Sequence, residues 1–373
     1  MKDSVLESLL TFKFIPGLGN VLIRQLIGYC GGIEAVLSEK PGRLQKIPGI
    51  GPKTIAALKD AKSKYADKVA EQMDFIKSKK VNAVHYLDKN YPQRLKELKD
   101  APLLLFHKGD FSLNAPRTVA IVGTRRPSFY GKDRLAKIVK GLHQYNVQII
   151  SGLAYGIDQA AHQNACDLNI PNIGVLGHGL DRIYPFQHKA LSEQMVKQGG
   201  GLLTEYIYGI KPERDNFPAR NRIIAGMADA VLVIETKKSG GSMITAKIAF
   251  SYNRDVFALP GNVGIQTSEG CNGMIKNNSA YLMETADDVA EQMGWNGNAG
   301  LNLQFEPEPK AAHLLAGKEK EVYEILKGKR QLHKDELTHA VAFSAHELSS
   351  ILLNMELKGL VKQLPGNFFC TAL

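Results

Sequence analysis

The central part of the chain alternates between short apolar runs and amphipathic helical patterns. The run Val119–Val122 breaks into a polar loop at residues 123–128, and a helical pattern follows that loop. A second apolar run, Val147–Ile150, ends in Ser151-Gly152 and precedes a helix that begins near Ile157. Apolar runs that alternate with helices in this way are typical of a parallel α/β sheet.

The same alternation continues toward residue 295, so we expect a doubly wound, mostly parallel Rossmann-like sheet with right-handed crossovers. The connector at residues 81–116 carries one short apolar run, at 101–106, and we expect it to dock the N-terminal region. The further predicted strands are Asn172–Leu176, Leu202–Glu205, Ala230–Ile234 and Asp255–Leu259, and the helices between them are Gln187–Lys197, Pro218–Met227 and Ser242–Tyr252.

Two similar glycine turns, Ile15–Gly19 and Ile47–Gly51, each lie between helical patterns in the first 80 residues. They predict a helix–hairpin–helix (SAM-like) domain over residues 1–80. The helix after each hairpin can offer free N–H groups to a DNA phosphate, and Lys53 is a possible secondary DNA contact. The alternative, a helical domain whose turns serve only packing, remains open.

The C-terminal residues 318–373 have the pattern of a winged helix. A capping box at Ser344–Glu347 opens a helix, and residues 360–371 predict a hairpin. The helix offers few basic side chains, so we favour protein contact or a structural role over duplex binding. Residues 296–317 predict a linker, which leaves residues 81–295 as the Rossmann-like domain with its leading connector.

The composition of the chain says more about its binding partners than about its fold. The 373 residues are 44% hydrophobic and 23% charged, with a formal net charge of +10, which favours a nucleic-acid partner. The four cysteines are widely spaced and predict neither a metal ribbon nor a disulfide framework. No signal pattern or membrane-length apolar run is present, so we expect a soluble cytoplasmic protein with no membrane contact.

The loops that follow the predicted strands carry small and basic residues, and in a parallel sheet these loops gather at one edge. Arg125 is the first candidate, because a guanidinium beside a strand end can grip a phosphate through two N–H groups. It could instead pair with Asp158, and Arg222 could pair with Glu235. The residues expected at this phosphate-binding edge are Gly123, Arg125, Arg126, Ser128, Ser151, Gly152, Arg220, Asn221, Arg222, Gly240, Gly241, Ser242 and Lys247.

Asp158 and His162 are four residues apart on one predicted helix, so their side chains can meet. A hydrolase would use them as an acid and a base, but we favour a structural hydrogen bond that fixes a loop. No third ligand of suitable spacing accompanies them, so the sequence predicts no metal site, and no cofactor is expected.

Five sequence blocks in a fixed order resemble the DNA-processing protein A (DprA/Smf) family. The resemblance is strongest over residues 92–295 and extends in more generic form to both ends. The blocks are Gly123–Gly131, Ser151–His162, Phe217–Gly226, Ser239–Ala246 and Val256–Gly261.

The resemblance implies a protein that binds single-stranded DNA and delivers it to the RecA recombinase, notably during natural transformation. It also implies a homodimer that forms through the α/β domain. Phe250 and Ile275 are possible dimer contacts, because they are apolar positions near the last strands.

An enzyme is the main alternative. The resembled fold is related to LOG-type nucleoside-monophosphate phosphoribohydrolases, which carry Pro-Gly-Gly-x-Gly-Thr-x-x-Glu after a strand. The comparable segment, residues 239–247, lacks that proline, the third glycine and the glutamate, so we expect binding without catalysis. A NAD-type enzyme is disfavoured because no Gly-x-Gly-x-x-Gly follows the first strand. A duplex-binding regulator would depend on the wing alone.

Overall fold

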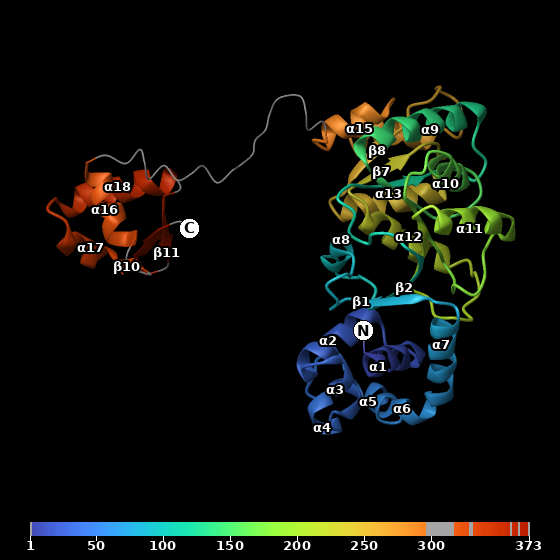
Figure 1. Ribbon diagram of the computed structural model, residues 1–373, viewed down its shortest axis with the longest axis horizontal. Coiled ribbons are helices and arrows are strands. Elements are labelled where there is room, and N and C mark those ends of the chain that lie inside the picture. The colour runs from blue at the N-terminus through green and yellow to red at the C-terminus, as the bar shows by residue number, and fades with distance from the viewer. Residues whose placement is uncertain (1, 296–316, 328–330, 359, 365, 372–373) are drawn as a thin grey trace. The chain divides into compact units, whose positions relative to one another are not determined.

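The computed structural model describes residues 2–295, 317–327, 331–358, 360–364 and 366–371 (Figure 1). The chain divides into two compact units, residues 1–295 and residues 296–373. The predicted linker at 296–317 lies outside the described residues except for its last position.

The N-terminal part of the larger unit is helical, as predicted. Gly17 and Gly49 have φ angles of 77° and 80°, in the left-handed region that glycine adopts without a steric penalty. These two glycines form the predicted hairpins, the first between α1 and α2 and the second between α4 and α5. The helices are α1 (Asp3–Phe14), α2 (Asn20–Cys30), α3 (Ile33–Ser38), α4 (Pro41–Leu44), α5 (Pro52–Lys59), α6 (Ala61–Lys64) and α7 (Ala66–Ser78).

The apolar core of these helices continues into the segment predicted as a connector. Buried Leu9 and Leu26 belong to the same core cluster as Leu104 and Phe106 of β2 (Leu104–Gly109). The cluster therefore crosses residue 80, where the sequence suggested a domain boundary. The connector also forms an additional strand, β1 (Asn82–His85), which the sequence pattern did not predict.

A nine-stranded sheet forms the centre of the larger unit, in the order β1-β2-β6-β5-β4-β3-β7-β8-β9. The prediction of a mostly parallel sheet is confirmed, because only the β1–β2 and β2–β6 pairs are antiparallel. The remaining strands are β3 (Thr118–Val122), β4 (Gln148–Ser151), β5 (Asn172–Val175), β6 (Gly201–Thr204), β7 (Ala230–Val233), β8 (Asp255–Ala258) and β9 (Tyr281–Leu282).

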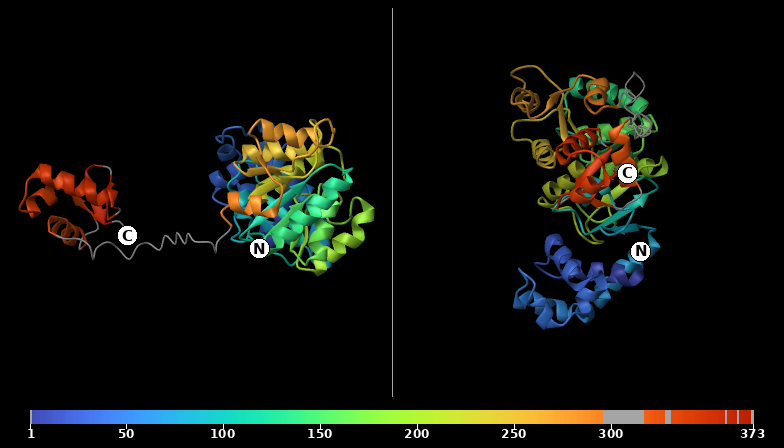
Figure 2. Two further views of the ribbon diagram at one scale, coloured as in Figure 1. Left: turned by 90° about the horizontal axis from the view of Figure 1, so that it is seen from above. Right: turned by 90° about the vertical axis from the view of Figure 1, so that its left-hand side faces the viewer.

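Helices cover both faces of the sheet (Figure 1 and Figure 2). Successive residues of β3 point to opposite faces, so Ala120 packs in one core cluster and Ile121 in another. The first cluster includes α12 (Asn216–Met227) and α13 (Gly241–Ser251), and the second includes α9 (Phe129–Leu142), α10 (Ile157–Asp167) and α15 (Ala286–Gln292). The other helices are α8 (Gln93–Lys96), α11 (Lys189–Lys197) and α14 (Glu269–Lys276).

The strand order changes direction at β3. From β3 the chain proceeds through β4, β5 and β6 on one side, and then returns to place β7 and β8 on the other side. The loops after β3 and β7 diverge at such a point and leave a crevice at the carboxyl edge of the sheet. Ligands of doubly wound proteins bind in this crevice.

The smaller unit has the predicted winged-helix elements. Ser344 caps its longest helix by accepting a hydrogen bond from the N–H of Glu347 at 3.3 Å. The predicted hairpin is present as two antiparallel strands. The elements are α16 (Lys318–Lys327), β10 (Leu332–His333), α17 (Lys334–Ala340), α18 (Ala345–Leu357), β11 (Val361–Leu364) and β12 (Phe368–Thr371).

Candidate functional site

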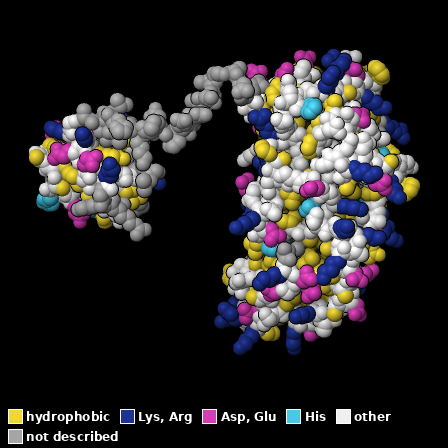
Figure 3. All heavy atoms as spheres, viewed as in Figure 1, with side chains coloured by type: hydrophobic (Ala, Val, Ile, Leu, Met, Phe, Trp, Pro, Cys, Tyr) yellow, Lys and Arg dark blue, Asp and Glu magenta, His cyan; other side chains and the backbone are white. Residues whose placement is uncertain are grey.

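Positive charge does not gather into a single patch on the face of the larger unit that Figure 3 shows. The chain has a formal net charge of +10, but Figure 3 shows Lys and Arg side chains spread over the visible face of the larger unit, mixed with Asp and Glu. The site must therefore be found from geometry.

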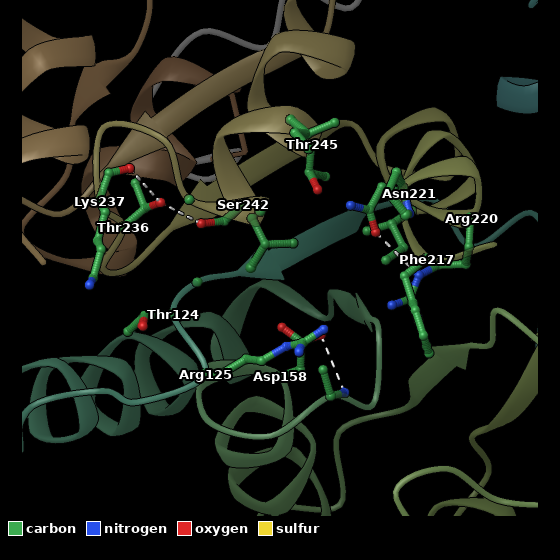
Figure 4. Close-up of a pocket in the computed structure, with 18 of the residues that line it drawn as sticks. Thr124, Arg125, Asp158, Phe217, Arg220, Asn221, Thr236, Lys237, Ser242 and Thr245 are labelled. Atoms are coloured by element: carbon green, nitrogen blue, oxygen red, sulfur yellow. Dashed lines mark hydrogen bonds between the residues drawn. The ribbon is translucent and has the colours of Figure 1, made fainter. Parts of the chain in front are cut away.

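A cavity of about 640 Å³ lies at the crevice between β3 and β7 (Figure 4). Its walls come from α12, α13 and the loops that follow β3 and β7. Small-molecule sites span roughly 300–1,000 Å³, so the space suits a ligand of nucleotide size. The lining residues are Val122, Gly123, Thr124, Arg125, Ala154, Asp158, Tyr184, Pro212, Arg214, Phe217, Pro218, Arg220, Asn221, Ile224, Thr236, Lys237, Gly240, Gly241, Ser242, Ile244 and Thr245.

The charged groups of the lining favour an anion. Four are cations (Arg125, Arg214, Arg220 and Lys237), and the one carboxylate is Asp158. Three of the cations, all but Arg220, are exposed. Within the part of the chain that the structure describes, these three form no salt bridge, so the alternative pairing of Arg125 with Asp158 is not observed.

Backbone contacts fix the loop that carries Arg125. The N–H of Thr124 donates to the carbonyl of Glu235 at 2.7 Å, and the carbonyl of Thr124 accepts from Ile157 at 3.1 Å. Gly156 has a φ of 85°, and a Cβ at this position would lie 2.6 Å from the carbonyl carbon of Arg125. A glycine is therefore required for the loops after β3 and β4 to approach this closely.

Ser128, predicted as a phosphate contact, instead joins the β3 loop to the end of β7. Its Oγ accepts from the N–H of Gly131 at 3.1 Å and so caps α9. Its Oγ and N–H both donate to the buried carboxylate of Glu235, at 2.6 and 2.8 Å. Ser128 does not line the cavity, so the serine orients the loop that presents Arg125.

Arg220 lines the cavity and also makes hydrogen bonds that hold the surrounding backbone in place. Its side chain is 4% exposed and donates to the carbonyl of Gly152 at 2.7 Å, and it also donates to the carbonyl of Val175. Its Nε donates to Oδ1 of Asn221 at 3.2 Å. These bonds connect α12 to the loop after β4 and to the end of β5, so Arg220 holds three segments next to the cavity together.

Asp158 provides the negative charge that compensates the buried positive charge of Arg220. Burial raises the pKa of its carboxyl, and the nearby Arg220 guanidinium acts in the opposite direction. Burial also lowers the pKa of Arg220 to about 10, which leaves it charged at neutral pH. The Asp158 carboxylate accepts from the N–H groups of Gly152 and Ala154 at 3.2 and 3.4 Å, so it also orders the loop after β4.

His162 does not bond to Asp158. Its Nδ1 lies 2.9 Å from Oδ1 of Asn172, and the ring is fully buried. Burial lowers the pKa of His162 to about 4, so the ring is neutral near pH 7. The two residues therefore have separate structural bonds, and the geometry offers no acid–base pair.

The glycine segment before α13 lies at the cavity as predicted. Gly240, Gly241 and Ser242 line it, and Gly241 begins α13. The Oγ of Ser242 donates to Oγ1 of Thr236 at 2.7 Å, which joins the helix start to the loop after β7. A helix N-terminus that faces a cavity favours negative charge there.

Five other expected residues lie outside the cavity lining. Arg222 pairs with Glu205 at 2.6 Å rather than with Glu235. Ser151 is fully buried and donates to the carbonyl of Ile121. Gly152, Arg126 and Lys247 complete this group, and of these Arg126 and Lys247 are exposed.

The possible secondary contacts lie elsewhere in the larger unit. Lys53 is exposed in the first turn of α5. Phe250 is 63% exposed beside a second, largely apolar cavity of about 530 Å³, which Lys247 also lines. Ile275 is partly buried and packs on the core, and its neighbour Met274 is a core residue.

Sequence reasoning missed several residues of the cavity wall. Arg214 lies in the polar segment between β6 and α12, and Lys237 lies in the loop between β7 and α13. Tyr184 and Phe217 face each other with ring centroids 5.8 Å apart. Each directly precedes a proline, and Tyr184 is also 49% exposed, which is a signal that the sequence pattern alone does not carry.

Within the described residues, no group of three or more His, Cys, Asp or Glu side chains is arranged to hold a metal ion. The helices described in the structure are too short or too polar to cross a bilayer.

The doubly wound sheet and the cavity at its switch point define a Rossmann-like protein. Two family models then identify the chain more closely. One, DNA recombination-mediator protein A, matches residues 82–294, and the other, the DprA winged helix domain, matches residues 306–367. The chain belongs to the DprA/Smf family, which confirms the resemblance seen in its sequence.

Known proteins support this assignment over most of the chain. Protein Smf of Synechocystis is 32% identical, with 96% of each chain covered. The X-ray structure of DNA processing protein A from Streptococcus pneumoniae has a TM-score of 0.66 at 33% identity, covering 78% of this chain and 98% of that one. A Helicobacter pylori structure, described as showing a single-stranded DNA binding mode, has a TM-score of 0.52 at 30% identity, with 57% and 95% covered.

Proposed function

We propose that this protein binds single-stranded DNA in the cavity between β3 and β7. The observation that carries the proposal is the set of exposed cations, Arg125, Arg214 and Lys237, that surround a helix N-terminus at the switch point. DNA phosphates would contact these groups. The single-stranded DNA binding named for the Helicobacter pylori relative supports this choice of ligand.

The cavity favours a single strand over a duplex. Its volume of about 640 Å³ accepts a nucleotide with an unpaired base, whereas a duplex would have to open before a base could enter. Tyr184 is 49% exposed and lies beside Phe217 in the same wall. A base that stacks on an aromatic ring gains about 1–3 kcal/mol without regard to sequence, so we expect little sequence preference.

Delivery of the strand to a RecA recombinase, notably in natural transformation, is the second part of the proposal. The family model describes a DNA recombination mediator, and α18, the long helix of the winged-helix unit, carries no Lys or Arg over its described residues Ala345–Leu357. A homodimer formed through the α/β domain is the third part. Exposed Phe250 beside the apolar second cavity supports it, and Ile275 directly follows Met274, which lines that cavity.

Replacing Arg125 with Ala tests the central site. Loss of a charge-assisted phosphate contact costs about 1.5–3 kcal/mol, which weakens binding roughly ten- to hundredfold. Fluorescence anisotropy with labelled single-stranded and duplex DNA at several salt concentrations measures the effect. The variant should also show a shallower salt dependence, because it releases fewer counterions.

Lys140→Ala is the matched control, since Lys140 is an exposed cation near the opposite end of α9, roughly 16 Å along the helix axis from Phe129. It should bind DNA normally. Normal binding by Arg125→Ala, or equal affinity of the unmodified protein for duplex DNA, would contradict the proposed site.

A further inference from the structure

Three exposed apolar side chains outside the cavity lining lie on two segments that a hydrogen bond between Tyr130 and Pro260 joins. Phe129 is 88% exposed at the first position of α9, and Val263 and Ile265 are 96% and 50% exposed in the loop that follows β8. We name these three residues the 129/263/265 patch. Large apolar side chains this exposed on two neighbouring loops indicate a contact surface.

Hydrogen bonds join this patch to the cavity through the carboxyl ends of three adjacent strands. Ser128, next to Phe129, bonds to Glu235 at the end of β7. The hydroxyl of Tyr130 donates to the carbonyl of Pro260 at the end of β8, at 2.8 Å. The Arg125 loop, the start of α9 and the β8 loop therefore form one continuous edge.

Charge along this edge shows which partner it fits. Arg126 is exposed between Arg125 and Phe129, and Lys237 and Lys238 are exposed on the neighbouring β7 loop. Among the described residues, none of these cations has a salt bridge, and Asp133, an acidic side chain on the first turns of α9, is paired with Lys137. A basic path that leads to an exposed aromatic ring matches the backbone and the unpaired bases of a nucleic acid strand.

From this arrangement we propose that the single strand leaves the cavity past Arg126 and that its next bases stack on the 129/263/265 patch. The inference rests on the proposed function of the cavity and extends its footprint. The cavity binds a few nucleotides, and the patch adds affinity only for strands long enough to reach it. Phe129 supplies the stacking face, and Val263 and Ile265 supply apolar contact.

The test compares Phe129→Ala and Val263→Ser/Ile265→Ser with unmodified protein on oligonucleotides of about 4 and about 16 nucleotides. The patch variants should bind the short strand normally and the long strand roughly five- to hundredfold more weakly. Phe129→Leu should restore only part of the loss, because leucine is apolar but has no ring. Tyr29→Ala removes an exposed aromatic residue from α2 and should change neither affinity.

A long strand without bases over its distal part provides a second readout. It should bind the unmodified protein as weakly as the intact long strand binds Phe129→Ala. Equal binding of the long strand by Phe129→Ala and the unmodified protein would overturn the inference. Two other results for Phe129→Ala would also overturn it if DNA affinity is unchanged: dissociation of a dimer in sedimentation, or loss of contact with the recombinase. If Arg125→Ala still weakens binding in those cases, the proposed function stands and only the extended path fails.

Discussion

Replacing Arg220 with Ala should damage folding and DNA binding together. The guanidinium is almost fully buried, and it donates to the carbonyls of Gly152 and Val175. It also opposes the buried negative charge of Asp158. The substitution leaves two carbonyls without this donor and removes the positive charge that offsets the buried Asp158 carboxylate.

The size of the effect follows from that loss. Removing one partner of a buried charge pair costs about 3–5 kcal/mol in the free energy of unfolding. For a unit this large, each kcal/mol lowers the melting temperature by about 2 °C, so we expect a decrease of roughly 6–10 °C. Affinity for single-stranded DNA should fall as well, because the loop after β4 and the end of β5 lose their common anchor.

Thermal unfolding by circular dichroism and DNA binding by anisotropy separate the two roles of arginine in this site. Arg125→Ala should lose affinity with an almost unchanged melting temperature, since its side chain is exposed and unpaired among the described residues. Arg220→Ala should lose both. A normal melting temperature for Arg220→Ala, combined with weak DNA binding, would refute a structural role and identify Arg220 as a direct phosphate contact.

Two further predictions concern stability and assembly. Burial lowers the pKa of His162 to about 4, below its unfolded value of about 6.5, so its contribution to stability is fully present above pH 6.5 and is lost as the pH falls toward 4. Denaturant titrations should show a loss on the order of 3 kcal/mol in the free energy of unfolding over this range, and His162→Gln should reduce that loss. An equal pH dependence of the two proteins would count against this prediction. Phe250→Glu should shift sedimentation of the full chain from dimer to monomer. Leu87→Glu changes another exposed apolar residue and, as the control, should leave sedimentation unchanged. A dimer that survives Phe250→Glu would exclude this surface as the dimer interface.

Strand and helix periodicity predicted most of the central fold, because buried parallel strands are apolar runs that stand out from their neighbours. β1 was not predicted, since its four residues lie at the sheet edge and alternate too briefly to show a period. The core that crosses residue 80 was also missed. Local pattern shows that Leu9 and Leu104 are buried, but it cannot show that they are buried together.

The candidate site was predicted in position but only partly in membership. Strand-end loops placed Arg125 and Gly241 at one edge of the sheet, where both line the cavity, because topology alone brings them together; their contact with phosphate stays a prediction. The sequence could not show which polar side chains are already occupied by protein groups. Ser128 and Arg222 have the right chemistry for a phosphate, yet each is bonded to a buried glutamate.

The close approach at Gly156 has a consequence for changing this protein by design. Any side chain there would strike the backbone of the Arg125 loop, so a library that aims to widen the cavity must leave residue 156 unchanged. Gly241, at the opposite wall, has no atom within 4 Å of a Cβ placed on it. Diversity introduced at residue 241 can therefore alter the cavity while the loop framework keeps its shape.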